Sequence, residues 1–202
     1  MNINCIVLAG GKSTRLGRDK VSEKIGDRSL LEQVINRIDP ISKEIIIVTA
    51  KERAFAELAG RPNIKFITDI IPGQGSLGGI YSGLVKSDSY YNIVLAADMP
   101  FVNAELLRYM AEVSQGYDFV LPRVEGLFEP LHAIYSKDCI GPIEKIFQNG
   151  SKVIIELFNY VKVRYIEVEE INKYDPQHLS FFNINTNEEL ERAKQIAAGT
   201  TH

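Results

Sequence analysis

Long apolar runs and an excess of charge of either sign are both missing from this sequence. No apolar run reaches the roughly 18 residues that a membrane-spanning helix requires, and the first eight residues lack the basic start of a signal peptide. The 202 residues carry 23 Lys plus Arg against 26 Asp plus Glu, a net charge of −3, which gives no general signal for polyanion binding. We therefore expect no binding to membranes or nucleic acid, and any phosphate binding must be local.

Cysteine is also scarce. The two cysteines, Cys5 and Cys139, are too few to form a zinc site alone or a framework of disulfides. We expect both to be buried thiols in a reducing compartment, and we expect the protein to be cytoplasmic. With 45% hydrophobic and 24% charged residues, the composition is that of a folded globular protein rather than a disordered chain.

Short apolar segments alternate with helical patterns along the first half of the chain. Several of these segments are apolar throughout, as strands covered on both faces are. The predicted strands are residues 5–8, 44–48, 64–67, 92–96 and 119–121, and the predicted helices are residues 30–38, 52–58, 77–85 and 104–113. This alternation predicts an α/β protein with a doubly wound, mostly parallel sheet in a three-layer arrangement.

The second half is less regular. A final helix is predicted over residues 187–197, with Thr186 as its N-cap and Glu189 completing a capping box. The other predicted elements are strands over residues 130–135 and 162–168 and helices over residues 138–147 and 152–160.

A glycine-rich and basic segment follows the first predicted strand, where open α/β sheets bind their ligands. Gly10 and Gly11 allow backbone amides to approach an anion closely, and successive amides of this kind bind anions. A Walker A loop is excluded, because its spacing would require glycine where the chain has Ile6. Two interpretations remain, a flexible basic loop or a loop that holds a polyphosphate. The basic residues that follow are Lys12, Arg15, Arg18 and Lys20.

A second glycine-rich segment, residues 73–78, matches the pattern G-x-G-x-x-G. In dinucleotide-binding proteins the glycines follow the strand at once, whereas residues 68–72 intervene here. The glycines can instead shape a loop that leads into a closely packed helix, or the loop can contact a nucleoside. The last interpretation makes Gly75 a candidate binding residue.

Two aspartates stand at the ends of predicted strands. Asp98 follows two alanines, and a carboxylate there is a natural ligand for Mg²⁺, which binds a carboxylate or two together with waters and phosphate oxygens. The alternative role, capping the next helix, suits Asn103 better because Asn103 is nearer that helix. Asp69 either forms a turn before Pro72 or faces the same cleft.

Four segments stand out together along the chain. They are residues 8–20 (Leu-Ala-Gly-Gly-x-Ser-x-Arg-Leu-Gly-x-Asp-Lys), Asp69 with residues 72–80, residues 95–100 (Leu-Ala-Ala-Asp-Met-Pro) and residues 182–186 (Phe-Asn-Ile-Asn-Thr). Taken together, they resemble the molybdenum cofactor guanylyltransferases: the first is similar to the signature loop of many nucleotidyltransferases, and the last points to the molybdopterin branch. The resemblance covers about residues 4–195 and implies a Rossmann-like nucleotidyltransferase fold.

This resemblance implies transfer of GMP from GTP to the terminal phosphate of molybdopterin, with Mg²⁺ as the metal and pyrophosphate as the leaving group. We expect a single domain over residues 1–202, with a nucleotide-binding half at 1–115 and an acceptor-side half at 116–196. The sequence leaves open whether the chain acts as a monomer or makes transient contacts with cofactor-biosynthesis or acceptor proteins. It also leaves open a cytidylyl- or sugar-phosphate nucleotidyltransferase of the same fold, or a non-catalytic nucleotide-binding protein.

The resemblance also implies roles for individual residues. Lys20 would hold phosphate and offset charge on the leaving pyrophosphate, and Asp98 would bind both Mg²⁺ and nucleotide. With Arg15, these two form the expected catalytic set. Asn183 and Asn185 would lie near the acceptor. The remaining expected nucleotide-binding residues are Leu8, Ala9, Gly10, Gly11, Asp69 and Gly75.

Three further features have structural and functional alternatives. His132 lies in a predicted strand, and we expect a satisfied core or edge histidine rather than a functional one. Arg123 either meets an anionic pterin phosphate or is solvated. A solvated strand edge is expected at Glu167, Glu169 and Glu170.

Overall fold

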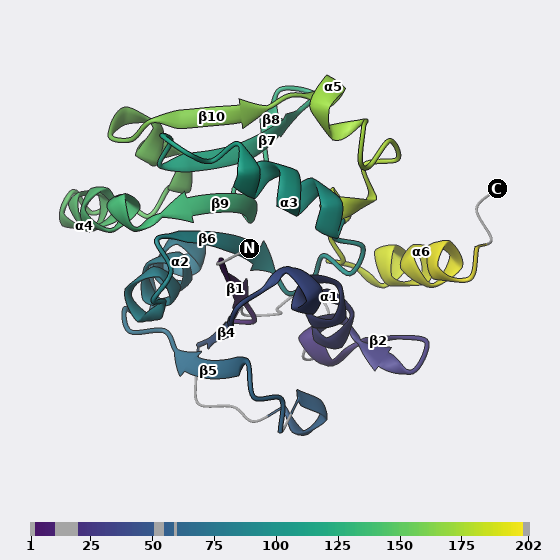
Figure 1. Ribbon diagram of the computed structural model, residues 1–202. Helices are drawn as coiled ribbons and strands as arrows, with labels where there is room; N and C mark the ends of the chain where they lie inside the picture. Colours follow the sequence, from purple (N-terminus) through teal and green to yellow (C-terminus); the bar gives the residue numbers. More distant parts are fainter. Residues whose placement is uncertain (1–2, 11–19, 51–54, 59, 200–202) are drawn as a thin grey trace.

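An eight-stranded sheet forms the centre of the protein in the computed structural model, which describes residues 3–10, 20–50, 55–58 and 60–199 (Figure 1). Along the sheet the strands lie in the order β10-β7-β9-β6-β1-β4-β5, with β8 paired to β7. Neighbours in this order are parallel except on the two sides of β9, which confirms a mostly parallel sheet. The strands are β1 (Asn4–Leu8), β4 (Ile45–Thr49), β5 (Ile64–Thr68), β6 (Tyr91–Ala96), β7 (Phe119–Val124), β8 (Leu127–Phe128), β9 (His132–Ser136) and β10 (Val163–Ile166).

The central strands are buried on both faces. Ile6 of β1 pairs in register with Ile46 of β4 on one side and with Val94 of β6 on the other, and all three side chains are fully buried. A strand covered on both faces has no solvent side on which to alternate polar residues. This explains the continuous apolar runs from which the strands were predicted.

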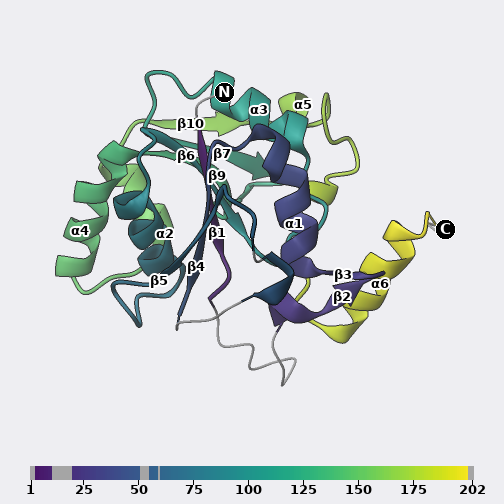
Figure 2. The same ribbon diagram turned by 60° about the horizontal axis from the view of Figure 1, so that its bottom comes forward.

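Helices cover both faces of this sheet, which confirms the three-layer arrangement (Figure 2). One core cluster joins α2 and α4 to one face, and a second joins α1 and α3 to the other. The helices are α1 (Leu30–Ile38), α2 (Gly75–Lys86), α3 (Ala104–Glu112), α4 (Ile140–Gln148), α5 (Val168–Ile171) and α6 (Asn187–Ala197). The 3₁₀ helices are η1 (Lys20–Ser22), η2 (Asp39–Ile41), η3 (Ala56–Leu58), η4 (Lys137–Cys139), η5 (Ile154–Asn159) and η6 (Leu179–Phe181).

Helix α6 lies outside these layers, beside a hairpin that the sequence did not predict (Figure 2). The hairpin consists of β2 (Lys24–Ile25) and β3 (Arg28–Ser29), strands too short to show a period in the sequence. The bounds of α6 and its capping box, in which Thr186 and Glu189 satisfy each other's backbone amides, confirm the prediction. Helix and hairpin share a small core of their own, separate from the two that cover the sheet.

Helix α2 packs very closely on β1 because it presents glycines to the strand. A Cβ on Gly83 would lie only 2.4 Å from Cγ2 of Ile6, and one on Gly79 would lie 3.1 Å from Cδ2 of Leu8. The strand β5 ends at Thr68 and α2 begins at Gly75, so the glycines do not follow the strand at once as in a dinucleotide-binding turn. The glycines that pack on β1 come after the G-x-G-x-x-G segment, whereas Gly73 and Gly75 within it have positive φ angles of 91° and 61° and shape the loop before the helix.

Several predicted elements differ in the structure. The helix predicted over residues 152–160 is the 3₁₀ helix η5, and of the helix predicted over residues 52–58 the described part is a loop position and η3. The strand predicted over residues 162–168 ends at Ile166, because Glu167 begins α5 as its N-cap. The solvated strand edge at Glu167, Glu169 and Glu170 was therefore a wrong prediction. Glu170 closes the capping box of α5 and pairs with Arg164 at 2.6 Å.

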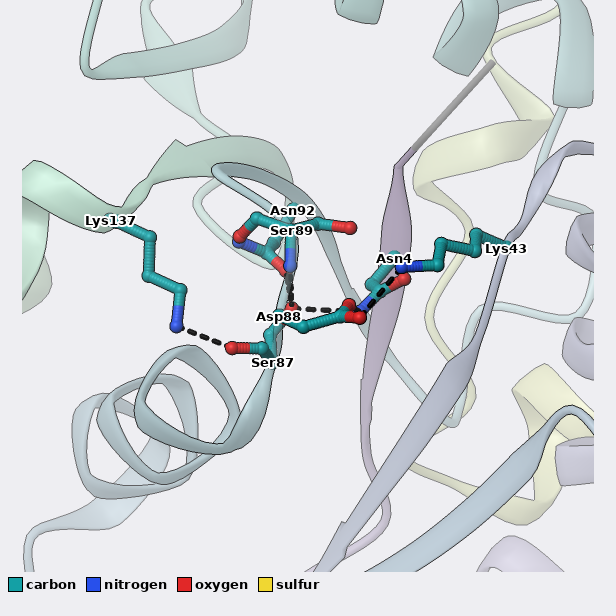
Figure 3. Close-up of polar contacts among 7 residues, drawn as sticks. All are labelled: Asn4, Lys43, Ser87, Asp88, Ser89, Asn92 and Lys137. Atoms are coloured by element: carbon teal, nitrogen blue, oxygen red, sulfur yellow. Dashed lines mark hydrogen bonds and ion pairs between the residues drawn. The ribbon is translucent and has the colours of Figure 1, made fainter.

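A polar network ties the amino ends of β1 and β6 to the end of α2 (Figure 3). The buried Asn4 amide donates to Ser87 Oγ and to Asp88 Oδ1, each at 2.9 Å. Lys43 Nζ contacts Asp88 Oδ2 at 2.6 Å, and Lys137 Nζ donates to the carbonyl of Ser87 at 2.5 Å. These bonds satisfy the buried amide nitrogen of Asn4 and the hydroxyl of Ser87, at the edge of the sheet opposite to the carboxyl ends of the strands, whereas the buried Asn4 Oδ1 has no partner among the described residues.

The two cysteines are buried, as predicted, and burial raises the pKa of both thiols to about 12. A thiol with such a pKa is inert at neutral pH, because the thiolate is the reactive form. Across the ranges that the structure describes, no helix is long and apolar enough to cross a membrane.

His132, the first residue of β9, is fully buried, as expected of a core histidine. The expectation that it would be satisfied was wrong, since neither ring nitrogen has a hydrogen-bond partner among the described residues. Burial lowers its pKa to about 4, and the charge of Asp175 acts weakly in the opposite direction. Its charged form is therefore strongly disfavoured in the folded protein.

We predict that this buried histidine makes the free energy of unfolding decrease as the pH is lowered. The unfolded chain binds a proton on this side chain near pH 6.5, whereas folded His132 binds one only near pH 4. Lowering the pH from 6.5 to 4 should therefore reduce the stability by about 3 kcal/mol. The measurement is denaturant unfolding at a series of pH values, with His132→Leu for comparison. The variant should show a shallower decline, and identical slopes in the two proteins would contradict the prediction.

Candidate active site

The candidate site lies where the carboxyl ends of β1 and β6 run side by side. From β1 the chain crosses to β4 on one side, and β6 later returns to the other side of β1. Ligands of open α/β sheets bind beyond the strand ends at such a point. The backbone remains fixed past the strand ends, because Ala9 N donates to Val48 O at 2.9 Å and Ala97 N donates to Leu8 O at 3.1 Å.

A pocket opens at this edge, between the ends of β1 and β4 and the start of α2. Four of the predicted binding residues line it, namely Leu8, Gly10, Asp69 and Gly75. The structure thus brings together residues from three separate segments of the chain. The pocket is completed by residues that the sequence analysis did not select: Val48, Thr49, Ala50, Ser76 and Gly79.

Gly10 approaches the end of β4 so closely that a side chain has no space. A Cβ at this position would lie 2.8 Å from the backbone nitrogen of Ala50 and 3.3 Å from the carbonyl carbon of Thr49. Contacts below 3.0 Å to backbone atoms cannot be relieved by a side-chain rotation. The glycine therefore allows the segment after β1 to lie against β4 and to present its backbone to the pocket.

Asp69 both forms a turn and faces the pocket, so the two alternatives for it are combined. Its backbone N–H donates to Thr49 O at 2.8 Å, and its Oδ1 accepts from Ile71 N at 3.0 Å. Ser82 on α2 donates to the same oxygen at 2.7 Å and accepts from Ile70 N at 3.0 Å. These bonds fix the carboxylate in one orientation beside Gly75.

Ser82 is a supporting residue that the sequence analysis missed. It is fully buried on α2, two turns after the start of the helix, and its hydroxyl also lies 2.8 Å from the carbonyl of Gly78. A serine in an otherwise small and apolar helix face is the signal that was available. Next to it, Gly78 leaves space for the Asp69 side chain, because a Cβ there would lie 3.2 Å from Oδ2.

Asp98 lies just past the end of β6, and its side chain is half-buried. Its neighbour Ala97 is bonded to Leu8, so Asp98 follows the strand tip beside the end of β1, but it is not one of the residues that line the pocket. The role of helix cap belongs to Asn103, as predicted, because its Oδ1 accepts from Glu105 N and Leu106 N. Asp98 is therefore not needed to begin α3.

The segment that carries Asn183 and Asn185, the residues expected near the acceptor, is bonded to the backbone of Asp98. Ile184 N donates to the backbone oxygen of Asp98 at 3.1 Å, and Asn183 and Asn185 flank Ile184. Asn183 is half-buried with its Nδ2 donating to Phe181 O at 3.1 Å, whereas Asn185 is exposed. Leu8, near the start of the chain, and Ile184, near its end, are thus both bonded to the backbone just past the end of β6.

Three of the predicted residues are less fully described. Gly11 and Arg15 lie outside the described residues, as does the side chain of Lys20. The backbone of Lys20 begins η1, which leads into the hairpin of β2 and β3. Ala9 is buried at the end of β1, with its N–H used by the sheet, and it is not one of the residues that line the pocket.

The donor groups of this site suit Mg²⁺ better than a metal that needs a full set of protein ligands. Over the described ranges, no group of three or more His, Cys, Asp or Glu side chains could hold a metal ion. A single carboxylate such as Asp98 fits Mg²⁺, which retains waters and takes further ligands from substrate phosphates. Zinc would require a set of three or four protein ligands.

Arg123 pairs with Glu167 while its side chain stays 42% exposed, so it is partly solvated, as one of the two alternatives had it. It donates to both carboxylate oxygens of Glu167, at 2.6 and 3.1 Å, and its guanidinium lies 5.0 Å from the centre of the Tyr165 ring. Its charge is therefore already matched by a bidentate partner.

Comparison with known proteins agrees with the fold and identifies the family. Residues 5–163 match the family model described as the MobA-like NTP transferase domain. A "Probable molybdenum cofactor guanylyltransferase" from Methanosarcina mazei is 38% identical over 197 residues, covering 93% of this chain and 88% of that protein. One of the same name from Pelotomaculum thermopropionicum is 34% identical, covering 95% and 92% of the two chains.

A solved structure extends this likeness to three dimensions. The molybdopterin-guanine dinucleotide biosynthesis protein A from Archaeoglobus fulgidus superimposes with a TM-score of 0.84 at 31% identity, covering 98% of this chain and all of that one. Both the family match and the relatives span the strand-end pocket and Asp98. The chain belongs to the MobA-like NTP transferase family and is a nucleotidyltransferase of molybdenum cofactor biosynthesis.

Proposed function

We propose that this protein transfers GMP from GTP to the terminal phosphate of molybdopterin and releases pyrophosphate. The observation that carries the proposal is the pocket at the end of β1, in which Leu8, Gly10, Asp69 and Gly75 converge beside Asp98. The names of the relatives support guanine and the molybdenum cofactor as the substrates. We place the reaction in the cytoplasm, with residues 1–115 on the nucleotide side and residues 116–196 on the acceptor side.

The nucleotide side offers complementary groups to GTP. The first turn of the 12-residue helix α2 opens into the pocket at Gly75 and Ser76, and the N–H groups of a first helical turn lack partners within the helix. These donors suit an oxygen of the nucleotide, and the ionised Asp69 carboxylate accepts hydrogen bonds only. Because Ser82 holds Asp69, this acceptor keeps one direction before the nucleotide binds.

The reaction requires no nucleophile from the protein. An oxygen of the acceptor phosphate, already anionic, forms a bond to the α-phosphorus of GTP. The bond from that phosphorus to the oxygen bridging to the β-phosphate breaks, and pyrophosphate leaves with the electron pair. Positioning and neutralisation of charge supply most of the rate in such transfers.

Charge neutralisation is assigned to the residues around the strand ends. Lys20 and Arg15 would face the phosphates and offset the charge on the leaving pyrophosphate. A Mg²⁺ ion held by Asp98 would neutralise charge on the same phosphates and orient them. Asn183 and Asn185 would bind the acceptor from the opposite side, where Ile184 holds them next to Asp98.

A nucleotide panel tests the proposal. Purified protein is incubated with Mg²⁺, molybdopterin and one of GTP, CTP, ATP or UTP, and pyrophosphate release and the dinucleotide product are measured. We expect product with GTP alone. Product with CTP would make the protein a cytidylyltransferase, and transfer only to a sugar phosphate would change the acceptor. Nucleotide binding without any turnover would contradict the proposal and favour a binding protein.

The Asp98→Ala variant tests the metal assignment. We expect kcat to fall by at least about 100-fold, because the carboxylate that holds the ion near the phosphates is removed. The rate should also no longer rise when Mg²⁺ is titrated. The control is Glu144→Ala, which removes a carboxylate on α4 that contacts Tyr81 instead. Full, Mg²⁺-dependent activity in Asp98→Ala would remove Asp98 from the site.

The Asn185→Ala variant tests the acceptor side. We expect the KM for molybdopterin to rise by about tenfold, since one or two hydrogen bonds are worth about this much, while the Kd for GTP stays the same. GTP binding is measured calorimetrically without acceptor, and the kinetics at saturating GTP. A defect confined to GTP binding would contradict the placement of Asn185.

A further inference from the structure

In the segment Phe-Asn-Ile-Asn at residues 182–185, side chains that pack in a core alternate with side chains that are more exposed. Phe182 and Ile184 belong to the small core between α6 and the hairpin, and Ile184 is fully buried there. Asn183 is half-buried and Asn185 is exposed. In an extended segment, residues two apart lie on the same side, so burying Ile184 turns both asparagines away from the core.

The small core that receives Ile184 joins three parts of the chain that lead into the site. Ile25 follows η1 by three positions, and Phe101 lies three positions after Asp98. Phe101 packs edge-on against Phe182, with ring centres 5.9 Å apart. The buried members of this third core are Ile25, Leu30, Ile184, Leu190 and Ala193.

The backbone on either side of Ile184 is also held. Its own N–H donates to Asp98 O at 3.1 Å, which fixes the segment to the tip of β6. One residue later, the N–H of Asn185 donates to Glu189 Oε2 at 2.6 Å, which fixes it to the first turn of α6. The short segment therefore spans from the sheet to α6, with the Ile184 side chain as its anchor.

We propose that Ile184 is a positioning residue for the transfer reaction, setting the places of Asn183 and Asn185 relative to Asp98 through the third core. The kinetic consequence of this proposal rests on the proposed function, whereas its structural consequence, the fixed places of Asn183 and Asn185, does not. If the core loosens, the asparagines lose their fixed distance from the strand tip, while the nucleotide pocket, built on β1, β4 and α2, stays intact. The segment after Lys20 keeps its place as well, because Glu23 O accepts from Leu30 N at 2.8 Å and Ile25 O accepts from Gln33 Nε2 at 3.1 Å. The acceptor side should then fail selectively.

Truncation of Ile184 tests this selectivity. Ile184→Ala should lower kcat/KM for the acceptor by about tenfold or more, since small misplacements of binding groups cost rate steeply, and should leave the Kd for GTP within about twofold. Ile184→Val, which keeps most of the buried volume, should recover most of the activity. Leu190→Ala breaks the same core from α6 and should reproduce the defect if Ile184→Ala does not fold.

A matched control separates positioning from loss of stability. Ile146→Ala makes the same truncation at a fully buried site on α4, in the core between the sheet and helices α2 and α4. It should lower the melting temperature but leave both kinetic constants near those of the parent protein. Equal acceptor defects in Ile184→Ala and Ile146→Ala, or an unchanged acceptor constant in Ile184→Ala, would overturn the proposal.

Amide hydrogen exchange reads the same positioning without any turnover. In the parent protein the amides of residues 184 and 185 should be protected by their bonds to Asp98 and Glu189. Ile184→Ala and Leu190→Ala should speed exchange at these amides by about tenfold or more, whereas Ile146→Ala should not. Unchanged exchange would overturn the inference, whereas a parent protein that exchanges as expected but transfers no nucleotide would refute only the proposed function.

Discussion

The close contact between α2 and β1 is the constraint on which the nucleotide side of the site depends. Gly83 and Gly79 let the helix lie directly on Ile6 and Leu8, so the start of the helix arrives at the end of the strand. From that position Ser82 reaches the Asp69 carboxylate and orients it. The burial of β1 on the face covered by α2, the course of α2 and the orientation of a pocket carboxylate are thus consequences of one helix–strand distance.

The site itself is an assembly of two halves that are far apart in the chain. The nucleotide pocket uses residues that come before the middle of the sequence, whereas the Asn183–Asn185 segment comes near its end. They meet through backbone hydrogen bonds at Asp98 and Leu8 and through the packing of Phe101 against Phe182. Backbone hydrogen bonds place no demand on side-chain identity, so the sheet and the residues that anchor the segment to it carry the geometry.

Much of this could be predicted from the sequence because local signals agreed with the final structure. The bounds of α1 and α6 follow from hydrophobic period and capping residues, and the helix cap at Asn103 follows from its position. The hairpin of β2 and β3 was missed because two-residue strands have no period. Glu167 and Glu170 were misjudged because a run of charged residues is typical of a solvated surface. In the structure Glu167 pairs with Arg123, which is distant in sequence, and Glu170 pairs with Arg164 of strand β10. Ser82 acts on Asp69 only through the tertiary fold.

The reversed direction of β9 sets the connection that precedes it apart from the residues that line the pocket. Because β9 runs against β6 and β7, residues 125–131 form a hairpin connection at the same edge as the site, beyond the strands that build the nucleotide pocket. Connections of this kind accept insertions and changes of sequence more readily than the hydrogen-bonded strands of a sheet do. During evolution the sequence of this connection could therefore change to suit a different acceptor, while the residues that line the pocket stayed the same.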